Sequence, residues 1–316
     1  MTSPSQSAGT RSEPLVLGHT GRRPPWTIGC SLPTRFVAGE HATHRLELDW
    51  VEMYRSADAC LVALRDRGVT SIELRDVRQD TDPAHVIQAL EALAQASMRI
   101  SLHLWLPADA RDLRPLVGDI ERVLPTDGTS VPCVLHAHRA ERDEDRRAAM
   151  DTTVDALRVL CDDLIASGSP LEPTLELCRL KPGGPVGTTF DELLEISDRV
   201  GKPDLRLCWD VGHGLSNHLT HQHELMPRSD FLASVGHTHI HDLTATGRTH
   251  GPLGDAEGPV GDQVRALARS GYRGIYDLEL EPSRWDVDPV EARAAVERSV
   301  AVLREILEGT ARTRTS

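Results

Sequence analysis

Apolar and polar side chains alternate along several short segments of this 316-residue chain. Between Ile275 and Glu281, for example, single apolar residues separate Asp277 and Glu279 from their neighbouring carboxylates. Successive side chains of a β-strand point to opposite faces, so this period of 2 predicts strands with one apolar and one polar face. The expected strands span residues 26–30, 70–75, 99–106, 131–138, 173–180, 204–210, 234–242 and 274–281.

Segments with the amphipathic pattern of an α-helix lie between these strands. The last of them begins at Asp288-Pro289, because proline is favoured in the first turn of a helix. The expected helices span residues 49–67, 84–97, 110–123, 143–167, 189–200, 221–233, 259–270 and 289–308.

The sequence therefore predicts eight consecutive strand–helix units, without a linker, composition shift or repeat between them. Eight such units favour an α/β fold with one closed parallel barrel, the (β/α)8 or TIM barrel, over an open sheet. Its active site is expected at the C-terminal ends of the strands. We predict a barrel over residues 24–309, a disordered N-terminal tail over 1–23 and a flexible C-terminal tail over 310–316.

Ionisable side chains stand late in four successive expected strands, just before the following loops: Glu176, Asp210, His239 and Glu279. A barrel brings these positions to one point. Buried charges are costly unless an opposite charge compensates them, and a divalent metal is the simplest compensator. Three carboxylates and one imidazole suit Mn²⁺, Co²⁺, Mg²⁺ or Zn²⁺. The alternative is a set of ordinary strand-end residues in separate ion pairs.

Two further histidines occupy matching positions on the third and fourth expected strands. His103 and His136 could bind a second metal, with Glu176 as the bridging ligand. A single histidine at such a position would more often be an interior side chain that donates to a carbonyl group.

Other polar residues are expected near substrate. His213 follows Asp210 by three residues, and His250 lies in a glycine-rich loop. Both are candidate substrate contacts, or together they could bind a further metal, and a solvated loop residue is the alternative. Glu73, on the second expected strand, could bind a substrate hydroxyl or pair with Arg75. A separate group is interpreted as surface or lid residues: His218, His221 and His223.

Composition narrows the function classes. The net charge of −13 argues against a large phosphate-binding surface, so nucleic acid is not the expected partner. No apolar run approaches the ~20 residues that a membrane span needs. The six cysteines include no CxxC pair, which predicts free thiols in a reducing cytoplasm. The chain carries no phosphate-binding loop, dinucleotide fingerprint or nucleophile elbow.

The motifs together resemble those of the xylose isomerase-like barrel superfamily over residues 26–305. This superfamily includes sugar and sugar-phosphate isomerases and epimerases, inosose dehydratases and the AP endonuclease family 2 group. The segments that carry the resemblance are Ser71–Arg75, Leu175-Glu176, Asp210–His213, His237–Asp242, Gly251–Gly254, Gly271–Gly274 and Leu278-Glu279.

Resemblance to the ketose epimerase branch implies that Glu176, Asp210, His239 and Glu279 hold one divalent metal. It also implies that Glu176 and Glu279 are the catalytic acid/base pair, which moves a proton at a carbon next to a carbonyl. A metal that holds the carbonyl and hydroxyl oxygens would stabilise the enediolate charge. His213 resembles that branch's contact to a substrate oxygen.

The endonuclease branch uses three zinc ions, and His103, His136, His213 and His250 resemble its additional ligands. One expected aspartate is replaced by Arg248, which could instead bind an anionic substrate group. The acidic net charge also disfavours a nuclease.

The resulting expectation is a metal-dependent isomerase or epimerase of a sugar, sugar phosphate or cyclitol. Its partner would be a small polyol or sugar, and the superfamily resemblance implies a homodimer or homotetramer. The first alternative is a multinuclear zinc or iron hydrolase or phosphoesterase, and a keto-cyclitol dehydratase lies between the two. The third alternative is a non-catalytic ligand-binding barrel.

Overall fold

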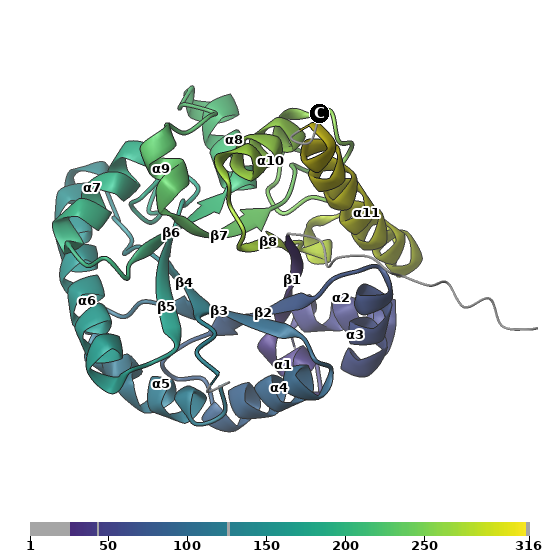
Figure 1. Ribbon diagram of the computed structural model, residues 1–316, viewed down its shortest axis with the longest axis horizontal. Coiled ribbons are helices and arrows are strands. Elements are labelled where there is room, and N and C mark those ends of the chain that lie inside the picture. Colours follow the sequence, from purple (N-terminus) through teal and green to yellow (C-terminus); the bar gives the residue numbers. More distant parts are fainter. Residues whose placement is uncertain (1–25, 43, 125–126, 314–316) are drawn as a thin grey trace, which may run out of the picture.

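The computed structural model describes residues 26–42, 44–124 and 127–313 as an eight-stranded parallel barrel. The strands pair in chain order, and β8 pairs with β1 to close the ring. Figure 1 shows the strands as an inner ring surrounded by helices. The predicted (β/α)8 barrel is therefore confirmed, whereas the predicted tail over residues 1–23 lies outside the described residues.

The strands are close to their predicted positions, although several end earlier than the alternation suggests. They are β1 (Thr27–Pro33), β2 (Ser71–Val77), β3 (Arg99–Trp105), β4 (Val131–His136), β5 (Leu171–Glu176), β6 (Arg206–Asp210), β7 (Val235–Ile240) and β8 (Ile275–Leu278). These ends place three of the candidate metal ligands at the rim of the barrel. Glu176 and Asp210 are the last residues of their strands, and Glu279 directly follows β8.

Helices and short 3₁₀ turns connect the strands. They are α1 (Thr34–Val37), α2 (Arg45–Tyr54), α3 (Ala57–Asp66), α4 (Pro83–Gln95), η1 (Ala110–Leu113), α5 (Arg114–Glu121), η2 (Asp143–Asp145), α6 (Arg146–Ser167), α7 (Phe190–Val200), α8 (Val211–His221), α9 (Ser229–Ser234), α10 (Pro259–Ser270), η3 (Pro282–Arg284) and α11 (Pro289–Thr313).

Three predicted segments differ from the structure. The single helix predicted over 49–67 is divided into α2 and α3, because Arg55 has a positive φ of 68° and Ser56 caps α3. The helix predicted over 221–233 is wrong, since α8 occupies 211–221 and only the short α9 follows. α11 continues to Thr313, so most of the predicted C-terminal tail is helical.

The barrel interior is polar over much of its length. Leu32, Leu74 and Leu102 are fully buried members of the apolar core, on the strand faces opposite the polar residues. Alternate residues point inward, and Oγ of Ser31 on β1 lies 2.7 Å from a carboxylate oxygen of Glu73 on β2 and of Asp277 on β8, the two neighbouring strands. Barrels usually fill this space with branched apolar side chains. Here ionisable groups replace them.

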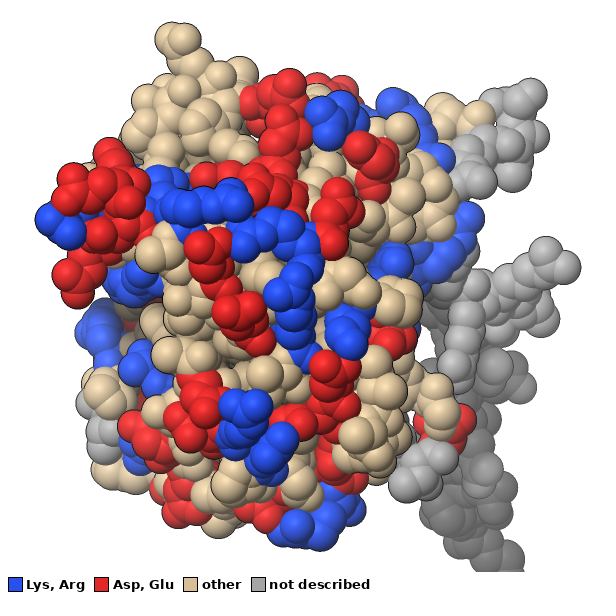
Figure 2. Space-filling model, turned by 90° about the vertical axis from the view of Figure 1, so that its left-hand side faces the viewer, with Lys and Arg blue, Asp and Glu red and all other residues tan. Residues whose placement is uncertain are grey.

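The outer surface of α6 and α7 carries charges of both signs. Arg147 pairs with Glu195, and Arg199 pairs with Asp151. Figure 2 shows basic and acidic side chains interspersed over this side of the molecule. Among the described residues, no helix is both long and apolar enough to cross a membrane.

α8 begins immediately after β6 and lies close to β7. A Cβ atom on Gly212, in the first turn of α8, would lie 1.9 Å from Cε1 of His241. Glycine at this position therefore allows the first turn of α8 to lie against the His241 ring.

We expect Gly212→Ala to destabilise the protein by about 1–3 kcal/mol, because the added methyl group overpacks the His241 ring. Urea unfolding monitored by circular dichroism would measure this change. Gly309→Ala in α11 is the matched control, since a Cβ atom there meets nothing within 4 Å. That variant should be neutral or slightly stabilised. Equal stability of the two variants would contradict the close packing of α8.

Candidate metal centre

Four side chains at the ends of consecutive strands meet at the C-terminal end of the barrel. Glu176, Asp210, His239 and Glu279 each offer one ligand atom, and these atoms lie within 4.8 Å of one another. All four residues are buried, and Glu176, Asp210 and His239 are completely inaccessible. The structure therefore brings together the four residues that the sequence suggested as metal ligands.

The unsatisfied atoms of this cluster are those that a cation would bind. Both carboxylate oxygens of Glu176, Oδ2 of Asp210, Oε2 of Glu279 and Nδ1 of His239 are buried and make no hydrogen bond of good geometry, although imidazole nitrogens lie beside the oxygens. Buried polar atoms are rarely left unsatisfied, and an absent ion is one of the standard reasons. Carboxylate oxygens and imidazole nitrogen are also suitable donors for a divalent metal. The residues present therefore fit such an ion.

Asp210 has a second function, because it caps α8. Its Oδ1 accepts a hydrogen bond of 2.6 Å from the backbone N–H of His213, and its Oδ2, which makes no hydrogen bond of good geometry, lies 2.9 Å from Nδ1 of the same histidine. Nε2 of His241 lies 3.1 Å from the same Oδ1. His241 in turn accepts a hydrogen bond from the backbone N–H of His250 through Nδ1. One chain of contacts thus orients a metal-ligand candidate and two loop histidines.

His103 and His136 lie beside the four-residue cluster, as predicted. Their Nε2 atoms are 3.2 Å and 2.9 Å from Oε2 of Glu176 and 3.2 Å from each other. These two nitrogens and this carboxylate oxygen are close enough together to contact a single additional ion.

His213 and His250 form a third group with His241, in which one nitrogen of each ring lies within 4.8 Å of the others. His213 contacts Asp210 and Glu176 through Nδ1, at 2.9 Å and 3.3 Å. His250 has a positive φ of 63°, and its Nδ1 lies 3.2 Å from Oε2 of Glu279. Both histidines line a cavity above the cluster.

Glu73 lies deeper than predicted. It is fully buried and does not line the cavity. Its Oε2 lies 3.0 Å from Nε2 of His239 and 3.1 Å from Nε2 of His237. Asp277 completes this lower layer through Ser31. In this structure Glu73 therefore orients His239 from below, and no surface of it faces the cavity.

For each of these groups, burial and the charges of its neighbours have opposite effects on the pKa. Burial alone would raise the pKa of Glu176, but the imidazoles of His136, His239 and His103 hold it well below its usual range. Burial would lower the pKa of His213, but Asp210 and Glu176 raise it to about 10. The cluster therefore favours ionised carboxylates, which is the form that binds a metal.

The cavity above the cluster has a volume of about 300 Å³. Glu176 and Glu279 line it together with His103, His136 and Trp105. Asp210 and His239 are absent from the lining, so they lie behind the two glutamates.

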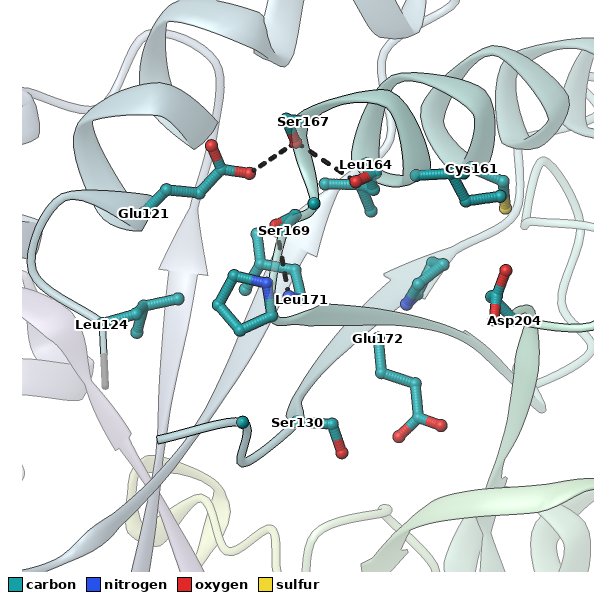
Figure 3. Close-up of a pocket in the computed structure, with 15 residues that line it drawn as sticks. Glu121, Leu124, Ser130, Cys161, Leu164, Ser167, Ser169, Leu171, Glu172 and Asp204 are labelled. Atoms are coloured by element: carbon teal, nitrogen blue, oxygen red, sulfur yellow. Dashed lines mark hydrogen bonds between the residues drawn. The ribbon is translucent and has the colours of Figure 1, made fainter. Parts of the chain in front are cut away.

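A larger cavity of about 820 Å³ lies at the opposite end of β5, near Leu171. Figure 3 shows Glu121, Glu172 and Asp204 around it. None of the metal-capable clusters found in the described part of the chain includes its residues. The smaller cavity is therefore the better candidate site.

Sequence reasoning missed several residues of the site. His237 and His241 share a strand face with His239, so the alternation placed them inward, but only His239 was assigned a function. Asp277 precedes Glu279 on the same face and was likewise unassigned. Arg248 is exposed and does not line the cavity. The position of Arg248 therefore does not support the prediction that it binds an anionic substrate group.

Asp210→Asn tests the four-residue cluster. Asparagine caps helices as well as aspartate does, so α8 should remain folded while one anionic ligand is lost. Mn²⁺ added to metal-free protein should raise the Tm of the unaltered protein by several degrees, because a ligand that binds only the folded state stabilises it. The rise should be at least halved in Asp210→Asn. The exposed Asp286→Asn is the matched control, and equal shifts in all three proteins would exclude Asp210 as a ligand.

A protein family and several solved structures are similar to this chain. A family model described as "Xylose isomerase-like TIM barrel" matches residues 61–306. None of the curated protein sequences compared with the chain is a match.

Several solved structures share the fold. An L-ribulose 3-epimerase has a TM-score of 0.61 at 17% identity, over 92% of this chain and 97% of that one. A D-psicose 3-epimerase from Clostridium cellulolyticum H10 has a TM-score of 0.60 at 11% identity, over 89% and 99%. A 3-keto-D-glucoside 4-epimerase from E. coli has a TM-score of 0.55 at 14% identity, over 89% and 99%. Because the family model spans more than half of the sequence, the chain belongs to the xylose isomerase-like TIM barrel family.

Proposed function

We propose that this protein is a divalent-metal-dependent epimerase or isomerase of a sugar or related polyol, which transfers a proton at a carbon next to a carbonyl. The main support for the proposal is that only two of the four candidate metal ligands line the cavity. Glu176 and Glu279 face the cavity, whereas Asp210 and His239 lie behind them. Two carboxylates that both contact a metal and face substrate are suited to act as acid and base.

The metal would be held by Glu176, Asp210, His239 and Glu279, whose unsatisfied atoms converge. When bound, a divalent ion polarises a substrate carbonyl and stabilises negative charge on its oxygen. The protein's own contribution is the orientation of these ligands. Asp210 is fixed by the N-terminus of α8, and His239 is fixed by Glu73 below it.

Proton transfer would involve the two glutamates in succession. Glu176 ends β5 and Glu279 follows β8, so β6 and β7 lie between them in the barrel. A substrate held between these strand ends presents one face to each carboxylate. One glutamate removes the proton from the carbon, and the other returns a proton to the opposite face. This sequence inverts the configuration at that carbon.

The cavity histidines would bind substrate oxygens. His213 contacts Asp210 and Glu176 through Nδ1, so Nε2 is its other ring atom for hydrogen bonding. His250 is positioned by Glu279 and by the positive φ of its own backbone. These groups would hold the substrate so that the reacting C–H bond lies near a glutamate, which reduces the entropic part of the barrier.

The structural neighbours support this proposal through their own activities. Three of them are epimerases, acting on L-ribulose, D-psicose and a 3-keto-D-glucoside. Their low sequence identities show a shared fold, so the activity proposed here depends on the site itself.

A second candidate is a multinuclear metal-dependent hydrolase. The observation that favours it is the contact of His103 and His136 with the same oxygen of Glu176. Two metal ions that share a carboxylate are typical of phosphoesterases. A keto-cyclitol dehydratase would begin with the same proton removal as the epimerase and would then eliminate water.

Hydrogen exchange tests the epimerase directly. The metal-loaded protein, incubated in D2O with a panel of ketopentoses, ketohexoses and 3-keto-glucosides, should incorporate deuterium next to the carbonyl of at least one sugar. Nuclear magnetic resonance would measure the rate. Glu176→Gln and Glu279→Gln should each reduce that rate by about 10²-fold or more, because each removes a proton-transfer group. The exposed Glu291→Gln should leave it unchanged. Full exchange in either cavity variant would remove that glutamate from the mechanism.

Metal content separates the two candidates. We expect about one divalent ion per chain in the epimerase, measured by elemental analysis of protein purified without added metal or chelator. Two or more zinc or iron ions, reduced by one in His136→Asn, would instead favour the hydrolase. Cleavage of bis(p-nitrophenyl) phosphate, together with no deuterium exchange in any sugar, would replace the epimerase proposal.

A further inference from the structure

The cavity above the metal cluster is lined by cationic side chains, although the whole chain has a net charge of −13. Five of its lining residues are arginines or lysine: Arg75, Arg139, Arg179, Lys181 and Arg284. Apart from the two glutamates of the metal cluster, only Asp76 and Glu281 among the lining residues are acidic. Positive charge is therefore concentrated at one place on an acidic protein.

Arg75 is the most informative of these cations. It is buried, with 6% of its surface exposed, and its Nε and Nη2 atoms have no hydrogen-bond partner. No carboxylate in the described part of the chain forms an ion pair with it. A buried guanidinium without an anion is costly, so this arrangement calls for an anionic ligand.

The backbone of β2 directs Arg75 to this place. Arg75 follows Glu73 by two residues, so both side chains point into the barrel, with Arg75 nearer to the C-terminal end. The register with β3 shifts between Leu74 and Val77, and Asp76 has a positive φ of 65°. Bulges of this kind redirect side chains next to binding sites.

Arg179 and Lys181 extend the cationic surface from the segment after β5. Neither has an ion pair with a carboxylate in the described ranges, and Arg139 bonds only to the carbonyl oxygen of Gly183. Burial lowers the pKa of Lys181, and Arg139, Arg179 and Arg284 lower it further. These cations are therefore close enough to repel one another, and an anion between them would relieve that repulsion.

The cations do not serve to neutralise the metal ligands. The charged contacts of Glu176 and Glu279 are to imidazoles, not to arginine or lysine. Among the lining arginines and lysine, Arg284 is the one with a carboxylate partner, because its Nε pairs with Glu281 at 2.5 Å. The charges on the remaining cations are thus available to a ligand.

We infer that the substrate is anionic, with a phosphate or carboxylate group at the end remote from the reacting carbon, and that Arg75, Arg179 and Lys181 bind this group. The assignment of the reacting end rests on the proposed epimerase function, whereas the anion site rests on the cations alone. Guanidinium groups suit both oxyanions, because their N–H donors match two oxygens at once. A cavity of about 300 Å³ limits the ligand to a small molecule.

Calorimetric titration of the metal-loaded protein tests this inference with four probes: D-fructose, D-fructose 6-phosphate, D-fructuronate and inorganic phosphate. We expect at least one of the two anionic sugars to bind tenfold or more tightly than D-fructose at low ionic strength. The ratio between the phosphate and carboxylate sugars then identifies which oxyanion is preferred. High salt should reduce the preference.

Two variants show whether the cations are responsible. Arg75→Gln and Lys181→Gln should each reduce the preference for the anionic sugar to threefold or less, with little change in the affinity for D-fructose. Arg269→Gln is the matched control, because this exposed residue lies at the C-terminal end of α10, where the chain enters β8 from the other end of the barrel. Arg248→Gln should also have no effect, since Arg248 does not line the cavity.

Equal affinities for D-fructose and both anionic sugars would overturn the inference. It would also be overturned if the preference survived in both cavity variants, because the anion would then be bound by the metal alone. Deuterium exchange in the same sugars keeps the two proposals separate. A preference for anions without exchange would leave the anion site intact and reject the epimerase, whereas exchange in neutral sugars without any preference would do the reverse.

Discussion

The carboxylate of Glu176 is the point on which the rest of this site depends. It is completely buried, and both of its oxygens lack a hydrogen-bond partner. Imidazole nitrogens of His103, His136, His213 and His239 nevertheless lie within 4.0 Å of it. An ionised carboxylate in such a place is stable only with positive charge around it. The four histidines lie on β3, β4, β7 and α8. Compensation of this one carboxylate therefore requires these four elements to meet at the end of β5.

A second polar layer supports the first. Ser31, Glu73, His237 and Asp277 fill the barrel below the cluster, and Glu73 holds His239 through Nε2. Metal-binding histidines commonly use their other ring nitrogen for such a contact, which fixes the orientation of the ring. The polar interior is therefore part of the site. The stability of the fold must come largely from the apolar layer between the strands and the surrounding helices, where Leu32, Leu74 and Leu102 are fully buried.

The sequence revealed the barrel and the central cluster because both follow from local periodicity. A period of 2 assigns each strand residue to a face, and eight repeated units allow only a few arrangements. Glu176, Asp210, His239 and Glu279 could thus be placed together before any contact was known. α8 was missed because Gly212 and Gly214 are poor helix formers, and only the tertiary structure reveals that Asp210 caps this helix. The cavity cations were missed for a related reason. Arg179 and Lys181 follow a strand, and the path of a loop is not encoded by periodicity.

In the proposed function, the two charged regions of the cavity would act on different parts of a ligand. The metal cluster would hold the reacting oxygens, and the cations would hold an oxyanion at the other end. Binding energy gained far from the reacting carbon can be used to fix that carbon between Glu176 and Glu279, which is where orientation lowers the barrier. The unpaired guanidinium of Arg75 would contribute to this binding, because the cost of burying it without a partner would be removed when the anion binds. A neutral sugar would leave that cost in place, so the group inferred to bind an anionic substrate would also select against an uncharged one.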